Sequence, residues 1–132
     1  MAKVSINGQN FITAALCGDG CCCVAVRKEG LNFLIADTKD PSAEPLVINA
    51  TRWESLKSEI QGGKLNLTEL SEQASDLAEH GISVRKIHSH LLVCDTVTNA
   101  DYSLAFTLKE WDAFIEGIKA DNFEDILLAN AA

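Results

Sequence analysis

The chain reads VRKEGLNFLIADT over residues 26–38 and VRKIHSHLLVCDT over residues 84–96. A shift of 58 positions aligns residues 24–66 with residues 82–124 without a gap, and nine of the 43 aligned pairs are identical. Unrelated segments of ordinary composition share only about 6% of their positions, which is about two or three pairs. Both tryptophans of the chain align with each other. The sequence therefore contains an internal duplication.

Each copy carries the patterns of three strands followed by a helix. The strand patterns are residues 21–27, 32–37 and 45–49 in the first copy and residues 82–87, 91–95 and 102–106 in the second. In the first helix, Trp53 and Ile60 share one apolar face, and Gly62-Gly63 is expected to end the helix. In the second, Thr107 and Glu110 form a capping box at the start. Its apolar stripe consists of Trp111, Phe114, Ile115 and Ile118.

These patterns predict an α+β fold. Its two β-β-β-α repeats would be related by a pseudo-twofold axis, with antiparallel sheets and helices packed into one compact unit. The first repeat spans residues 1–66 and includes an N-terminal hairpin that turns at Asn7-Gly8. The second spans residues 67–132 and begins with an amphipathic helix over residues 67–80. We expect Trp53 and Trp111 to lie in the core.

The composition is that of an ordinary globular protein of 132 residues, 47% of them hydrophobic. No run reaches the roughly 18 apolar residues that a membrane span needs. No apolar segment of a secretory signal follows the N-terminus. We therefore expect a cytoplasmic protein without a membrane partner, in which the five cysteines are free thiols.

The net charge of −8 is unevenly distributed. Residues 1–66 are neutral as a set, so residues 67–132 carry the whole of it. An acidic half repels phosphate groups, and direct binding to nucleic acid is therefore not expected. A basic partner protein fits better, and self-association into a homodimer is left open. The outward face of the predicted helix over residues 67–80 is a candidate surface for such a partner, although an acidic helix face is more often simply solvated. It consists of Glu69, Glu72, Asp76 and Glu79.

Several short motifs occur in a recognisable order. They are CVAV at residues 23–26, DTKDP at residues 37–41, PLVI at residues 45–48 and Trp53 in a helix closed by Gly62-Gly63. This order resembles the actinobacterial domain of unknown function 397, a family that includes BldB-like small regulators. The second copy keeps Cys94-Asp95-Thr96 and reads EWDAFIEGIKADNFE over residues 110–124. The resemblance covers about residues 11–66 and 82–125, as if two copies were fused. It implies a non-enzymatic accessory regulator, an antitoxin-like partner of a helix-turn-helix DNA-binding protein.

The pairs Asp37-Thr38 and Asp95-Thr96 recur at equivalent strand ends. Two carboxylates could serve acid–base chemistry. An Asp-Thr at a strand end more often hydrogen-bonds its own turn. We favour turn formation, with contact to a partner as the second interpretation.

The cysteines offer a hypothesis of a different class. Cys17 and residues 21–23, together with His80, His88 or His90, could make the protein thiol- or metal-responsive. Successive residues of a strand face opposite ways, however, so Cys21, Cys22 and Cys23 cannot converge on one ion. Since motifs of known enzymes are also missing, we expect no catalytic residue, no cofactor and no metal.

Overall fold

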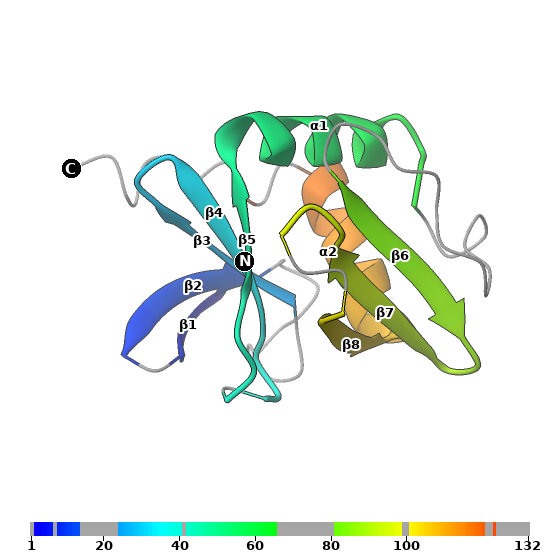
Figure 1. The fold of residues 1–132 in the computed structure, drawn as a ribbon, viewed down its shortest axis with the longest axis horizontal. Coiled ribbons are helices and arrows are strands. Elements are labelled where there is room, and N and C mark those ends of the chain that lie inside the picture. Colours follow the sequence, from blue (N-terminus) through cyan, green and yellow to red (C-terminus); the bar gives the residue numbers. More distant parts are fainter. Residues whose placement is uncertain are drawn as a thin grey trace.

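The structure is a computed structural model that describes residues 2–6, 8–13, 24–40, 42–65, 81–98, 101–120 and 123. These residues form an α+β fold with two antiparallel sheets and two helices (Figure 1). The five-stranded sheet has the order β1 (Ala2–Ile6), β2 (Gln9–Thr13), β3 (Val24–Glu29), β4 (Asn32–Asp37), β5 (Leu46–Asn49). The three-stranded sheet has the order β6 (Ile82–Ile87), β7 (His90–Asp95), β8 (Ser103–Thr107). The helices are α1 (Ala50–Gln61) and α2 (Leu108–Lys119).

The element order β3-β4-β5-α1 is followed by β6-β7-β8-α2. The shift that aligns the two copies of the sequence also carries the bounds of β3, β4 and α1 onto those of β6, β7 and α2. The strand pairing follows the same shift, since Val26 lies opposite Ile35 and Val84 opposite Val93. The predicted strands and helices are therefore present in the described parts of both copies.

Local signals set the ends of the helices. Asn49 caps α1 by accepting a hydrogen bond from the backbone N–H of Arg52, and Thr107 and Glu110 form the predicted capping box of α2. α1 ends at the predicted glycine, Gly62. The predicted N-terminal hairpin is present as β1 and β2. The predicted helix over residues 67–80 lies outside the described residues.

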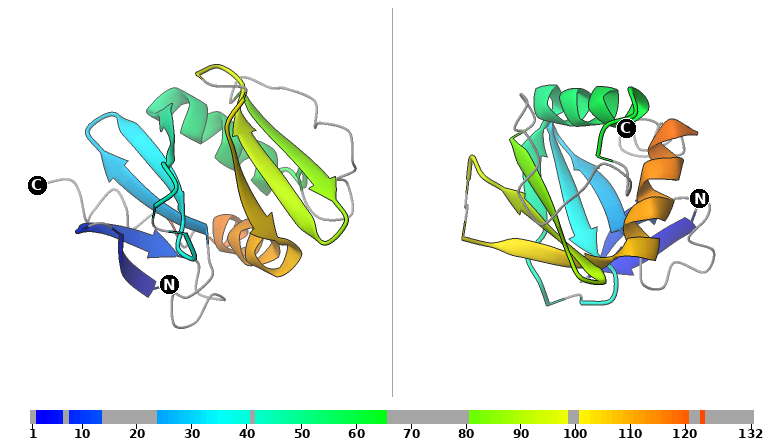
Figure 2. Two further views of the ribbon diagram at one scale, coloured as in Figure 1. Left: turned by 60° about the horizontal axis from the view of Figure 1, so that its bottom comes forward. Right: turned by 90° about the vertical axis from the view of Figure 1, so that its right-hand side faces the viewer.

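One hydrophobic core joins the two halves of the chain. Figure 1 shows the five-stranded sheet on the left, the three-stranded sheet on the right and α1 along the top; Figure 2 shows α2 from two further sides. The core draws on both sheets and both helices. Its members include Val26, Phe33, Ile35, Ile48, Trp53, Leu56 and Ile60 from the first half, and Val84, Leu91, Val93, Phe106, Trp111, Phe114 and Ile118 from the second. The described residues therefore form one compact unit.

The N-terminal hairpin gives the five-stranded sheet a second, smaller apolar cluster. It consists of Ile6, Phe11, Ala25, Leu34 and Ala36. Since successive residues of a strand face opposite sides, Phe33 and Ile35 enter the main core while Leu34 and Ala36 enter the smaller cluster. This explains why β4 reads as a continuous apolar run.

Each tryptophan contacts a residue that follows the helix of the other half. Trp111 donates its indole N–H to the carbonyl oxygen of Leu65 at 2.9 Å. Trp53 meets Phe123 edge to face, with ring centroids 6.3 Å apart. Leu65 and Phe123 are themselves equivalent positions of the two copies. Trp53 and Trp111 are 3% and 1% exposed, so both rings help to join the halves.

The shared core predicts a single unfolding transition. Phe106 is fully buried in the second half, and Phe106→Ala should lower the free energy of unfolding by about 3–5 kcal/mol. Because the core is common, the loss should be equal whether unfolding is followed by the fluorescence of Trp53 or of Trp111. The measurement is urea denaturation in Trp111→Phe and Trp53→Phe backgrounds, with the exposed Ala105→Gly as control. Separate midpoints for the two tryptophans would contradict a shared core.

Candidate functional site

Two aspartates predicted as site residues end equivalent strands and form equivalent turns. Asp37 ends β4 and accepts a hydrogen bond from the backbone N–H of Lys39 at 3.0 Å. Asp95 ends β7 and accepts one from the backbone N–H of Val97 at 3.1 Å. An aspartate that bonds the N–H two residues on is a common turn arrangement. The residues are 5% and 1% exposed, so their carboxylates are used inside the fold.

Asp95 is neutralised by an arginine of the other half. Arg52, the third residue of α1, directs both terminal nitrogens at the two carboxylate oxygens. Thr98 adds a hydrogen bond from its hydroxyl at 2.7 Å. Burial by itself raises the pKa of Asp95, but the hydrogen bonds from Arg52, Thr98 and Val97 outweigh it and hold that pKa below its ordinary value. We call these residues the Asp95 cluster.

Asp37 is neutralised by a lysine of its own half, which also reaches the other half. The Lys39 ammonium lies 2.7 Å from Asp37 Oδ2 and 3.2 Å from Oε1 of Glu110. It also donates to the carbonyl oxygen of Ala105 at 2.6 Å and lies over the ring of Phe106. Burial lowers the pKa of Lys39, but the hydrogen bonds to Asp37 and Glu110 outweigh it and raise that pKa above its ordinary value. We call Asp37, Lys39 and Glu110 the Asp37 cluster.

The two clusters occupy equivalent positions, but the side chain at one of these positions carries the opposite charge in each. Arg52 and Glu110 are each the third residue of their helix, and the repeat alignment places them opposite each other. In the Asp95 cluster this position supplies the cation. In the Asp37 cluster it supplies a second carboxylate, and Lys39 supplies the cation at the position that Val97 holds in the other half.

The threonines of the predicted sites, Thr38 and Thr96, lie in the turns that follow the two aspartates. Thr96 donates its hydroxyl and its backbone N–H to the carbonyl oxygen of Gly81, and Thr38 is half-buried. Gly81 has a φ of 68°, and a Cβ there would lie 2.6 Å from a methyl of Val97 and 2.9 Å from Arg52. Glycine at this position therefore leaves room for the Asp95 cluster.

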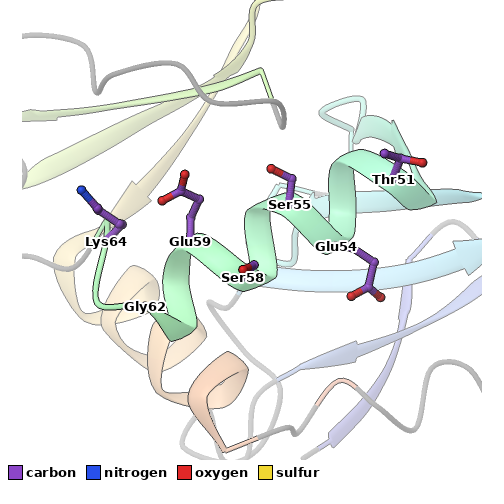
Figure 3. Close-up of a pocket in the computed structure, with 7 residues that line it drawn as sticks. All are labelled: Thr51, Glu54, Ser55, Ser58, Glu59, Gly62 and Lys64. Carbon is purple, nitrogen blue, oxygen red and sulfur yellow. The ribbon is translucent and has the colours of Figure 1, made fainter.

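The hollows of the described surface include one along α1 and one beside β8. One, of about 550 Å³, runs along α1 and is lined by Thr51, Glu54, Ser55, Ser58, Glu59, Gly62 and Lys64 (Figure 3). In that view Glu54 and Glu59 point in opposite directions, so their carboxylates do not meet. The other, of about 740 Å³, lies between β8 and the loop that joins β4 to β5. Its lining includes Asp37 and Lys39 and so touches the Asp37 cluster.

The residues of the thiol or metal hypothesis lie mostly outside the described part. Cys17, residues 21–23 and His80 are among these, so that hypothesis stays a prediction. Of the described residues, Cys94 is a buried free thiol, and His88 and His90 are exposed at the β6–β7 turn. No three described side chains of His, Cys, Asp or Glu are grouped so that they could hold a metal ion.

Four acidic residues that were expected to meet a partner also fall outside the described part. They are Glu69, Glu72, Asp76 and Glu79. No helix in the described ranges is long and apolar enough to cross a membrane.

Comparison with family models, curated proteins and solved structures found no match to this chain. The resemblance to the domain of unknown function 397 therefore stays a prediction that rests on the motifs themselves.

Sequence reasoning did not find the ionic roles of Arg52 and Glu110. The signal was present, because the repeat alignment sets a basic opposite an acidic side chain while Asp37 and Asp95 stay identical. The alignment alone did not show that each helix start lies against the strand end of the other copy.

The Asp95 cluster predicts a pH-dependent effect of Asp95→Asn. Since the pKa of Asp95 is lowered on folding, its contribution is present above about pH 4 and is lost as the pH falls through the pKa of the folded state. At pH 7 the substitution removes the carboxylate that pairs with the largely buried Arg52 and should cost about 3 kcal/mol. Urea denaturation at pH 7 and pH 3 measures this, and the difference from the parent protein should shrink at pH 3. A difference that stays the same at both pH values would contradict it.

Proposed function

We propose that the chain is a fusion of two copies of one β-β-β-α unit, related by a pseudo-twofold axis. Several pairs of contacts support this relation. Contacts between β4 and β8 have counterparts between β5 and β7, and the two tryptophan contacts exchange when the copies are exchanged. The Tyr102 hydroxyl bonds the carbonyl oxygen of Glu44, and these two residues are themselves equivalent positions. A contact between equivalent positions is what a twofold axis produces where it passes between them.

We further propose that the protein is a non-enzymatic module that binds a basic protein partner. The observation that carries this proposal is the placement of charge. The described residues hold eleven basic and eleven acidic side chains and are neutral as a set, so the whole net charge of −8 belongs to the remaining residues. Of the aspartates and glutamates outside the described residues, four fall in residues 66–80 and three in residues 121–132. Neither segment contains a lysine or arginine. Such concentrated charge favours fast, salt-dependent association with a basic surface.

The buried charges of the fold are consistent with a scaffold rather than a reactive centre. Asp37, Asp95 and Glu110 each contact a cation that also joins the two halves. Perturbed ionisable groups occur in structural ion-pair networks as well as in active sites. Here the pairs coincide with the contact between the halves, which supports the structural interpretation.

The resemblance to the domain of unknown function 397 supplies a class for the partner. A helix-turn-helix protein presents a basic face to DNA, and an acidic accessory protein could cover that face. The proposed function is therefore that of a cytoplasmic, antitoxin-like accessory regulator.

A pull-down from the source lysate at two salt concentrations tests this function. We expect the tagged protein to retain a basic DNA-binding protein at low salt and to lose it at high salt, because screening weakens exposed charge pairs. Neutralising Glu69, Glu72, Asp76 and Glu79 to the corresponding amides should remove the same protein at low salt. The matched control neutralises Glu29, Glu54, Glu59 and Glu116 in the described part and should retain it. The proposal would be contradicted if the same protein were retained at high salt and by the variant with the four amides.

A further inference from the structure

One edge of the three-stranded sheet faces the hollow beside β8. The edge is formed by β8, and among the described strands β8 pairs with β7 alone. The Ala105 carbonyl accepts a hydrogen bond from Lys39, and the Thr107 backbone N–H donates to Glu110. Both groups therefore point away from β7. In an antiparallel pair, residues alternate between those bonded to the neighbouring strand and those that are not. The backbone N–H and C=O of Ser103, two residues before Ala105, must then also point away from β7. The backbone of Ser103 and Ala105 therefore faces the hollow.

The opposite wall of the hollow is the loop between β4 and β5. Asp40, Ser42, Ala43 and Glu44 line it. The Tyr102 hydroxyl bonds the carbonyl oxygen of Glu44 at 2.7 Å and so holds this loop to the start of β8. The hollow is therefore a groove between this loop and β8 that exists before any ligand binds. A preformed groove lowers the ordering cost of a ligand.

The groove carries uncompensated negative charge. Its one basic lining residue, Lys39, is engaged by Asp37 and Glu110. Asp40 and Glu44 are exposed, and among the described residues neither forms an ion pair. Burial, and next the charge of Glu44, raise the pKa of Tyr102 above its ordinary value. The wall opposite the free strand edge is therefore acidic.

We propose that this groove binds an extended peptide segment of a partner protein by strand addition to β8. The backbone of the segment bonds the N–H and C=O of Ser103 and the N–H of Ala105, because the Ala105 carbonyl already accepts a bond from Lys39. A lysine or arginine side chain of the segment faces Asp40 and Glu44. Strand addition of this kind obtains affinity from backbone hydrogen bonds and selectivity from the alternate side chains. The proposal deepens the proposed function, because it names a binding surface on the described body in addition to the acidic segments outside it.

The test uses the full chain, labelled with ¹⁵N, and a short capped peptide that alternates lysine and valine. We expect amide shifts at residues 103–105 and in the loop of residues 40–44, together with slowed hydrogen exchange at Ser103. Ser103→Pro removes the donor at a position where an edge strand tolerates proline, and it should weaken binding about tenfold or more. Ser103→Ala keeps the N–H and should bind like the parent protein. Thermal unfolding checks that both variants remain folded.

A second pair of variants tests the charge of the groove. Asp40→Asn with Glu44→Gln should weaken the lysine peptide about tenfold, whereas Glu54→Gln with Glu59→Gln on α1 should leave it unchanged. A peptide alternating glutamate and valine should not bind. The proposal would be overturned if the peptide shifted amides outside residues 40–44 and 103–105 instead, or if Ser103→Pro bound the peptide as tightly as the parent protein. Shifts of the same amides with protein concentration alone would also overturn it, since the occupant would then be a second copy. If Ser103→Pro binds the peptide like the parent protein while the full chain still retains a salt-sensitive partner from lysate, the groove proposal fails and the proposed function stands.

Discussion

The structure depends on neutralising buried carboxylates where the two halves meet. Asp37 and Asp95 end the middle strand of each repeated unit, and both are almost fully buried. An unpaired buried charge costs several kcal/mol, which is a large part of the roughly 5–15 kcal/mol that separates a folded from an unfolded domain. Each aspartate therefore requires a cation, and in both clusters that cation contacts the two halves. The two clusters therefore join the halves at two places in addition to the shared core.

The two clusters meet the same requirement in different ways. In a dimer of identical chains, equivalent positions must hold the same residue. In a fused chain they can diverge, because each faces only one partner. The third helix position is arginine in α1 and glutamate in α2, and Lys39 supplies the cation that lies between that glutamate and Asp37. The same lysine closes one end of the groove beside β8. The proposed peptide site thus lies where the two halves differ, while the shared core lies where they agree.

Much of the fold follows from local patterns in the sequence. The bounds of β4 and β6, the capping box at Thr107 and the glycine end of α1 are determined by neighbouring residues, and the sequence predicts them. The contact of Arg52 with Asp95 spans 43 positions, and it arises only after the two units pack. Its prediction requires knowledge of which faces meet, and a repeat alignment lacks that information. The turn role of Asp37 and Asp95 was predictable because the bonded N–H lies two residues away, whereas their inter-half partners were not.

The most direct test of this account is an exchange of charge within the Asp37 cluster. Lys39→Val leaves Asp37 facing Glu110 and should lower the free energy of unfolding by about 2 kcal/mol, since Lys39 is one-third exposed. Glu110→Arg alone loses the capping box and places two cations together, at a similar cost. In the double variant, the arginine introduced by Glu110→Arg can pair with Asp37 as Arg52 pairs with Asp95. If the halves are equivalent, urea denaturation should find the double variant within about 1 kcal/mol of the parent protein. A double variant that loses the sum of both costs would contradict the equivalence of the two clusters.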